Sequence, residues 1–229
     1  MISVIISWPD SFDFPLFRNN MPELLEHVDE VIICFTQHGN HPLRKWLRAN
    51  IPGVVFLDVE DKGDKYGDWR NQSTNYMIDA SVGDWILSLE QDFFINNYPH
   101  FFNTIKKAME NNDVIIYNEG NRFHPACMFV KKDVLKKTKR DFSVMGQGRD
   151  HFSEVSKELK GMKINIATLE SLDLLEHRDW SHMRGLTDNY FAPKPYAGLE
   201  EFKKYNDLCK EVTPMNDYWK KEMERCDEI

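Results

Sequence analysis

The sequence lacks the features that mark membrane-spanning and disulfide-stabilised proteins. Its longest apolar runs are about five residues, far below the roughly 18 that a transmembrane helix needs. Its four cysteines, Cys34, Cys127, Cys209 and Cys226, have no paired metal-ligand spacing, and their wide scatter is typical of reduced thiols in a cytosol. The amino terminus has neither the basic segment nor the small-residue cleavage site of a signal peptide. We therefore expect a cytoplasmic protein with no transmembrane segment.

Glycine-rich phosphate loops and an excess of basic charge are also missing. The sequence contains neither Gly-x-Gly-x-x-Gly nor the Gly-Lys-Ser/Thr of a P-loop, which disfavours a dinucleotide-binding protein and a P-loop enzyme. The net charge is -8, and residues 1–100 carry 15 acids against 7 bases, whereas the remainder carries 22 of each. This imbalance disfavours general nucleic-acid binding and suits a site for a divalent cation, which can in turn hold phosphates.

One basic cluster departs from this pattern in the second half of the chain. It comprises Lys131, Lys132, Lys136, Lys137, Lys139 and Arg140. A charge run of this kind is usually a solvated helix face, and that is our interpretation here. The alternative is a surface that binds nucleic acid or an anionic lipid, and strong salt dependence of binding would reveal it.

What the sequence does have is an alternation of apolar strands and helices. Hydrophobic residues make up 41% of the 229 residues and aromatics 13%, which is enough for a sizeable core. The first half predicts strands at 2–7, 30–36, 54–59 and 84–90 and helices at 16–28, 41–50 and 69–80, with Pro22-Glu23 placed to open a turn. Continuous apolar strands separated by helices predict a mostly parallel sheet that is covered on both faces.

The pattern loosens after residue 92. We expect helices at 101–109, 132–139 and 150–159, strands at 114–117, 126–130 and 164–169, and a strand at 174–177 that leads into a polar loop. Apolar spacing predicts a tail helix at 199–212, ended by Pro214, and a second short helix to residue 225. The sequence has no internal repeat and no low-complexity linker, so it predicts one α/β domain with a helical appendage.

Two carboxylates stand at the end of the fourth predicted strand. Glu90-Gln91-Asp92 follows the apolar residues 85–89 directly. Open α/β sheets bind ligands at the carboxyl ends of their strands, and side chains at i and i+2 of a strand face the same way. Glu90 and Asp92 therefore predict a shared hard cation with open positions for diphosphate oxygens. The plainer interpretation is that acidic residues simply end a strand.

The order of motifs around these carboxylates resembles that of GT-A glycosyltransferases, especially family 2. The block DWRNQSTNYMIDASVGDWILSLEQD contains Arg70-Asn71, an amphipathic helix, Gly83-Asp84, an apolar strand and an acidic pair. The opening ISVIIS and Trp8-Pro9 resemble the first strand of the family and its nucleotide-facing turn. The resemblance covers residues 2–95 and extends more loosely to about residue 190. It departs from the family at Glu90, where an aspartate is usual.

The resemblance implies an α/β fold of GT-A type, which is Rossmann-like, with a mostly parallel central sheet flanked by helices and a carboxyl-terminal helical appendage. It divides the chain into a glycosyltransferase domain at 1–195, with a nucleotide-sugar and metal half at 1–95 and an acceptor half at 96–195, and a helical extension at 196–229. It implies a metal-dependent transferase that moves a sugar from a nucleoside-diphosphate sugar to an acceptor. Mn²⁺ or Mg²⁺ would be the ion, a UDP-sugar is the family default, and inversion is one stereochemical outcome. The acceptor is open: glycan, lipid, protein or nucleic acid.

The resemblance also assigns residues to the donor and the metal. Asp92 would chelate the ion, Glu90 would touch the ribose or reach the ion through water, and Arg70 would meet the base or the phosphates. A late histidine would complete the metal shell, and we favour His182, which stands in a His-x-x-Gly setting, over His177. The remaining donor-binding candidates are Ser7, Trp8 and Gln91.

The general base is expected near the next helix. Gly146 and Gly148 precede Asp150, and the family often places an acidic residue at such a helix start, where it serves inverting enzymes as the base. His151 is the alternative base. Asp150 as a simple helix cap is an equally good interpretation, and the two roles are compatible.

Two other kinds of protein remain open. A non-catalytic module of the same fold that binds a nucleotide or carbohydrate would need neither Asp92 nor Asp150. A sugar nucleotidylyltransferase shares the fold, but its glycine-rich amino-terminal loop with a trailing arginine is missing here.

Overall fold

The computed structural model describes residues 1–8, 14–35, 52–59, 66–90, 93–119, 122–143, 152–176 and 178–182. The strands within these ranges are β1 (Ile2–Trp8), β2 (Glu30–Phe35), β3 (Val54–Asp58), β4 (Trp85–Leu89), β5 (Phe93–Ile95), β6 (Val114–Glu119), β7 (Arg122–Lys131), β8 (Ile166–Thr168) and β9 (Trp180–His182). The helices are α1 (Phe14–His27), α3 (Tyr66–Ala80), α4 (Tyr98–Ala108), α5 (Lys132–Leu135), α6 (Ser153–Gly161) and the short 3₁₀ helix η1 (Glu170–Leu172).

The main sheet has seven strands in the order β3-β2-β1-β4-β7-β6-β8. The strands β3, β2, β1 and β4 run parallel to one another, and β7 runs antiparallel to both β4 and β6. A separate two-stranded sheet pairs β5 with β9. The predicted mostly parallel α/β sheet is confirmed, and the reversed strand β7 is the feature that the sequence pattern does not reveal.

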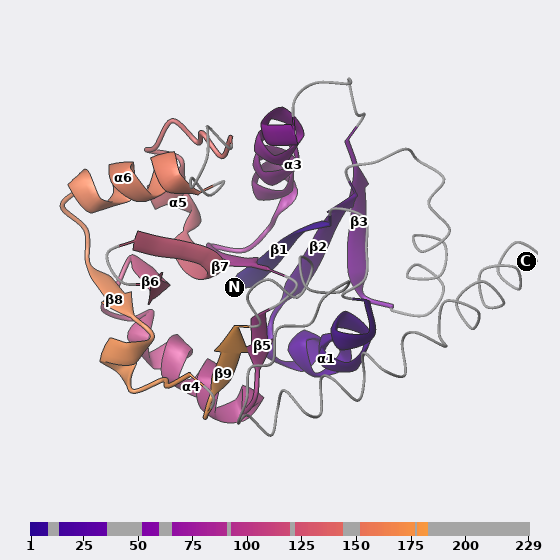
Figure 1. The fold of residues 1–229 in the computed structure, drawn as a ribbon, viewed down its shortest axis with the longest axis vertical. Helices are drawn as coiled ribbons and strands as arrows, with labels where there is room; N and C mark the ends of the chain where they lie inside the picture. Colours follow the sequence, from indigo (N-terminus) through magenta and orange to yellow (C-terminus); the bar gives the residue numbers. More distant parts are fainter. Residues whose placement is uncertain are drawn as a thin grey trace, which may run out of the picture.

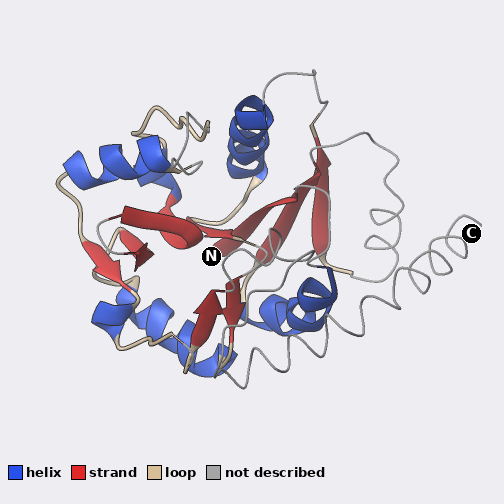
Figure 2. Cartoon of the chain, viewed as in Figure 1, coloured by secondary structure: helices blue, strands red, loops and turns tan. Residues whose placement is uncertain are grey.

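Helices cover both faces of the sheet, with α1 and α4 on one side and α3, α5 and α6 on the other (Figure 1). Figure 2 shows the strands lying between these two groups of helices. The alternation within β1 explains the arrangement, since Val4 and Ile6 pack in the cluster with α1 and α4 whereas Ile5 packs in the cluster with α3, α5 and α6. The inner strands β1, β2, β4, β6 and β7 therefore bury apolar side chains on both faces, as continuous apolar sequences predict.

The connection from α3 to β4 passes very close to β1. The N–H of Gly83 donates to Ser3 Oγ at 2.8 Å, and Ser3 Oγ donates to Glu30 Oε2 at 2.6 Å. A Cβ at position 83 would lie 2.6 Å from Ser3 Oγ and 2.7 Å from the Ser3 nitrogen, too close for any side chain. The Gly83 of the family-like block is therefore required by packing.

Most of the predicted elements match the structure to within a few residues, and several need correction. Pro22 lies inside α1 and does not open a turn, because the buried Met21 and Leu24 anchor the helix on both sides of it. The helix predicted at 132–139 ends at Leu135, where Thr138 Oγ1 donates to the Leu135 carbonyl at 2.8 Å and competes with further helical bonds.

The remaining corrections concern short elements. Helix α6 begins at Ser153 with Phe152 as its N-cap residue, three residues later than predicted. Residues 174–176 form no strand, and the strand of this region is β9. The predicted helices at 41–50 and 199–225 lie outside the described residues, as does the whole proposed extension 196–229. The side chains of Cys34 and Cys127 are buried. Within the described residues, no helix is both long and apolar enough to cross a membrane.

Candidate functional site

Glu90 lies where the fourth strand ends. Its N–H donates to the Ala126 carbonyl of β7 at 3.0 Å, and its own carbonyl accepts the N–H of Phe93 at 3.2 Å. These two bonds hold Glu90 between the ladder of β4 with β7 and the start of β5. The Glu90 carboxylate is therefore at the carboxyl edge of the parallel strands, where this kind of sheet binds ligands.

His182 reaches the same edge from the second, smaller sheet. The pairing of β5 with β9 sets Phe93 opposite His182, and Trp180 stacks on Phe93 with ring centroids 5.1 Å apart. The buried Asp179 directly precedes β9 and holds the start of this strand in place, since its carboxylate accepts the N–H of Leu175 at 2.8 Å. The position of His182 thus depends on an aromatic stack and a buried carboxylate, not on a flexible loop.

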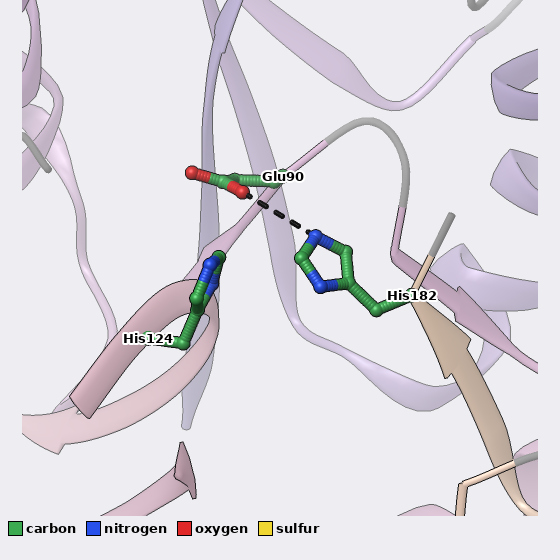
Figure 3. Close-up of side chains that lie close together, drawn as sticks. All are labelled: Glu90, His124 and His182. Atoms are coloured by element: carbon green, nitrogen blue, oxygen red, sulfur yellow. Dashed lines mark ion pairs between the residues drawn. The ribbon is translucent and has the colours of Figure 1, made fainter. Parts of the chain in front are cut away.

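The two predicted metal residues Glu90 and His182 lie together in the structure. His182 Nε2 is 3.8 Å from Glu90 Oε2 (Figure 3), and the His182 side chain is 3% exposed against 25% for Glu90. Nitrogen and oxygen ligands stand about 2.0–2.2 Å from an ion, so one ion can join two such atoms up to roughly 4.3 Å apart. A carboxylate and an imidazole at this separation therefore fit a divalent metal ion.

A third polar side chain, His124 of β7, faces the same place. Ligand-type atoms of Glu90, His124 and His182 all lie within 4.8 Å of one another. The His124 ring is 6% exposed and meets the His182 ring edge to face, with centroids 4.7 Å apart. Tyr117 of β6 stands opposite His124 in the ladder and contacts both histidine rings. This cluster is mostly buried, and Glu90 is its half-buried member.

His124 is the residue that sequence reasoning missed. His124 reaches Glu90 only because β7 pairs with β4. In this antiparallel pairing Leu89 lies opposite Cys127, so the residues just before Cys127, among them His124, lie beside the residues just after Leu89, among them Glu90. No spacing within the sequence encodes this antiparallel register. The only local signal is a histidine two residues before the predicted strand 126–130, beside the aromatic Phe123, and such a histidine is usually a core residue.

The other predicted site residues fall into three groups. Ser7 is half-buried at the end of β1, in register with Cys34 of β2. The backbones of Trp8 and Arg70 lie in β1 and α3. Five predicted residues lie outside the described part of the chain: Gln91, Asp92, Asp150, His151 and His177. The roles of all three groups remain predictions.

The basic cluster contains cations that are already paired. Lys131 Nζ lies 2.8 Å from Asp113 Oδ1, and Arg140 Nη1 lies 2.7 Å from Asp79 Oδ1. The ion pair and hydrogen bond with Arg140 hold the pKa of Asp79 below its usual value. These contacts favour the interpretation of the cluster as a solvated surface that stabilises the fold.

The fold is similar to those of several solved structures. A mannosyltransferase from Pyrobaculum calidifontis, determined in complex with GDP-Man and Mn²⁺, is 14% identical with a TM-score of 0.53, over 73% of this chain and 54% of its own. S. aureus TarS 1–349 is 13% identical with a TM-score of 0.51, over 83% of this chain and 62% of its own. The 4-diphosphocytidyl-2C-methyl-D-erythritol synthase from Anaerococcus prevotii is 13% identical with a TM-score of 0.51, over 73% of this chain and 85% of its own.

These similarities define the class of fold: the chain has the GT-A fold, as the motif order predicts. At 13–14% identity they establish the fold alone. This chain spans about half the length of the mannosyltransferase, 54%. No protein-family model and no curated protein matches its sequence.

Proposed function

We propose that the chain is a metal-dependent glycosyltransferase that moves a sugar from a nucleoside-diphosphate sugar to the hydroxyl group of an acceptor. The observation that carries the proposal is the contact of His182 with Glu90 at 3.8 Å, at the carboxyl edge of β4. Support comes from three directions: the GT-A fold, the chemistry of the carboxylate and imidazole donors, and the acidic first half of the chain. A metal-dependent glycosyltransferase accounts for all three of these features.

Glu90, Asp92 and His182 would hold the metal, with His182 preferred to His177. A divalent cation bound there would offset the negative charge that develops on the departing nucleoside diphosphate. Imidazole is a poor ligand for Mg²⁺ and a good one for softer divalent ions, so Mn²⁺ is the ion that this donor set favours.

The chain's own side chains would bind and orient the donor around that ion. Arg70 would meet the donor's base or phosphates, because its guanidinium can bind two phosphate oxygens at once. Ser7 and Trp8 are the last two residues of β1, and Gln91 comes two residues after the end of β4 in the sequence; all three would line the donor pocket. The sequence resemblance favours a UDP-sugar, and the mannosyltransferase structure with GDP-Man makes guanosine donors the second choice.

The binding test is calorimetry of UDP- and GDP-sugars with and without Mn²⁺. We expect donor binding to require Mn²⁺, to be lost in Asp92→Ala and to weaken in Glu90→Gln and His182→Ala. Glu110→Gln, at an exposed carboxylate beyond the end of α4, is the matched control and should bind as the wild type does. Unchanged Mn²⁺-dependent affinity in Asp92→Ala and His182→Ala would contradict the metal assignment.

A second candidate is a nucleotidyltransferase, favoured by the fold similarity to the cytidyl-transferring synthase over 85% of that chain. The products separate the two functions. A glycosyltransferase releases a nucleoside diphosphate from a nucleotide sugar, whereas a nucleotidyltransferase releases pyrophosphate from a nucleoside triphosphate and a sugar phosphate. Assaying both products in parallel with Mn²⁺ decides between them, and release of neither points to a binding module.

A further inference from the structure

One of the two nitrogen atoms of His124 has a backbone partner. The backbone N–H of Ala126 donates to His124 Nδ1 at 3.1 Å. A nitrogen accepts such a bond only through a lone pair, and a neutral imidazole has one lone pair and one N–H. The contact with Ala126 therefore places the lone pair on Nδ1 and the proton on Nε2.

This tautomer conflicts with a metal bond through Nε2. A ligating nitrogen needs its lone pair for the ion, so the remaining proton would sit on Nδ1. Nδ1 would then point an N–H at the N–H of Ala126 at 3.1 Å, and two buried donors would face each other without an acceptor. Proximity alone suggests a site of three ligands, but this backbone hydrogen bond argues against His124 as one of them.

The Nε2–H of this tautomer needs an acceptor, and the Glu90 carboxylate lies nearby. The ring extends from β7 toward the carboxylate of Glu90, with His182 beside them (Figure 3). Among these three clustered side chains, Glu90 is the anionic one, and it is also the one that solvent reaches. A buried N–H is nearly always satisfied by an acceptor, and a bond to a charged carboxylate is about twice as strong as a neutral one.

We propose that His124 is a positioning residue that donates its Nε2–H to the Glu90 carboxylate and does not ligate the metal. One carboxylate oxygen is then held by His124, which leaves the other to face His182 and the ion. The metal part of this inference rests on the proposed function, since the ion is what Glu90 would be positioned to bind. The tautomer and the donor role do not depend on it.

The direct test is ¹⁵N NMR of the histidine rings in the metal-free protein, because protonated and unprotonated ring nitrogens resonate far apart. Signals that disappear in His124→Gln are assigned to His124. We expect a protonated Nε2 and an unprotonated Nδ1, and we expect this pattern to persist after addition of Zn²⁺, while the His182 signals shift. A proton on Nδ1, alone or together with one on Nε2, overturns the proposal in either state.

Two substitutions separate a donor from a ligand in a second measurement. His124→Gln keeps an N–H donor near the position of Nε2, whereas His124→Asn keeps an acceptor near Nδ1 but has no group that reaches Glu90. For a positioning residue, Mn²⁺ affinity should stay within about threefold in His124→Gln and fall roughly 10–100-fold in His124→Asn. Equal losses in both variants, or a larger loss in His124→Gln, contradict the donor role.

A failure of the proposed metal-dependent function can be distinguished from a failure of the proposed donor role of His124. If the wild-type protein binds no Mn²⁺, the metal-dependent transferase fails as a function. The NMR pattern of the metal-free protein still decides whether His124 is a donor. Thermal unfolding midpoints of both variants, measured alongside, show whether any loss of affinity reflects loss of the fold.

Discussion

The side chain of Asn71 on α3 accepts the backbone N–H of Phe142 through Oδ1 at 2.9 Å. One helical turn further on, Asn75 Nδ2 donates to the Arg140 carbonyl at 3.0 Å, and Arg140 Nε donates back to Asn75 Oδ1 at 2.6 Å. These bonds hold Arg140 in a left-handed conformation, with φ of 54°, which is unusual for a residue other than glycine. The asparagine of the family-like Arg-Asn pair thus fixes the segment that leads toward Asp150.

Replacing Asn71 with alanine should destabilise the protein by about 1–3 kcal/mol, because the Phe142 N–H then lacks its acceptor. Gln72→Ala is the matched control: Gln72 is exposed on the same helix, and its loss should change stability by less than about 0.5 kcal/mol. Urea unfolding of the two variants measures both values. Equal stabilities would mean that the 140–143 segment does not depend on α3.

Gly83→Ala should destabilise the protein by about 1–3 kcal/mol or prevent folding, since its Cβ would overlap the backbone and hydroxyl of Ser3. Gly161→Ala provides the contrast. A Cβ at Gly161, the last residue of α6, meets nothing within 4 Å, so the better helix propensity of alanine should leave stability unchanged or raise it by up to about 1 kcal/mol. Differential scanning calorimetry of both variants tests the pair, and similar midpoints would contradict the close approach.

Asp113 should make the free energy of unfolding fall as the pH becomes acidic. The hydrogen bond from Lys131 at 2.8 Å, followed by that from the Asn165 N–H, lowers the pKa of the Asp113 carboxyl in the folded protein. The contribution of Asp113 is therefore complete above its unfolded pKa near 4 and is lost as the pH falls through the lower folded value.

The measurement is urea unfolding of the wild type and Asp113→Asn at a series of pH values. The wild type should exceed the variant by about 1 kcal/mol at pH 7, and the gap should close as the pH falls toward 3. Asp133→Asn, at an exposed carboxylate on α5, is the control for the loss of one negative charge. A stability difference between the wild type and Asp113→Asn that grows as the pH falls would contradict a lowered pKa of Asp113 in the folded protein.

Asp150→Asn tests the proposed general base. The amide keeps the shape of the carboxylate but cannot accept a proton, so turnover should fall by roughly 10²–10⁴-fold. Donor affinity should be unchanged, because the residue would act on the acceptor. Near-normal turnover would remove Asp150 from the chemistry and favour His151, and His151→Ala is the variant to assay next.

The sequence is enough to predict β1, β2 and β4, because runs such as Val31–Cys34 are apolar at every position and are buried on both faces. It does not predict β5 and β9, which have three residues each and exist only because they pair with each other. Glu90 was found because it directly follows a strong strand. The approach of His124 was not, because the register of β7 on β4 is set by contacts nearly forty residues apart in sequence.

The position of β7 between β4 and β6 also sets when the site exists during folding. Glu90 is fixed only when β7 pairs with β4, because its N–H donates to the Ala126 carbonyl, and the same pairing brings in His124 after a long loop has closed. His182 arrives later still along the chain, when β9 docks on β5. Non-local pairings of this kind form slowly, since loop closure must come before their contacts. A ligand that needs all three side chains therefore stabilises only the completed topology, and partly folded chains gain nothing from it.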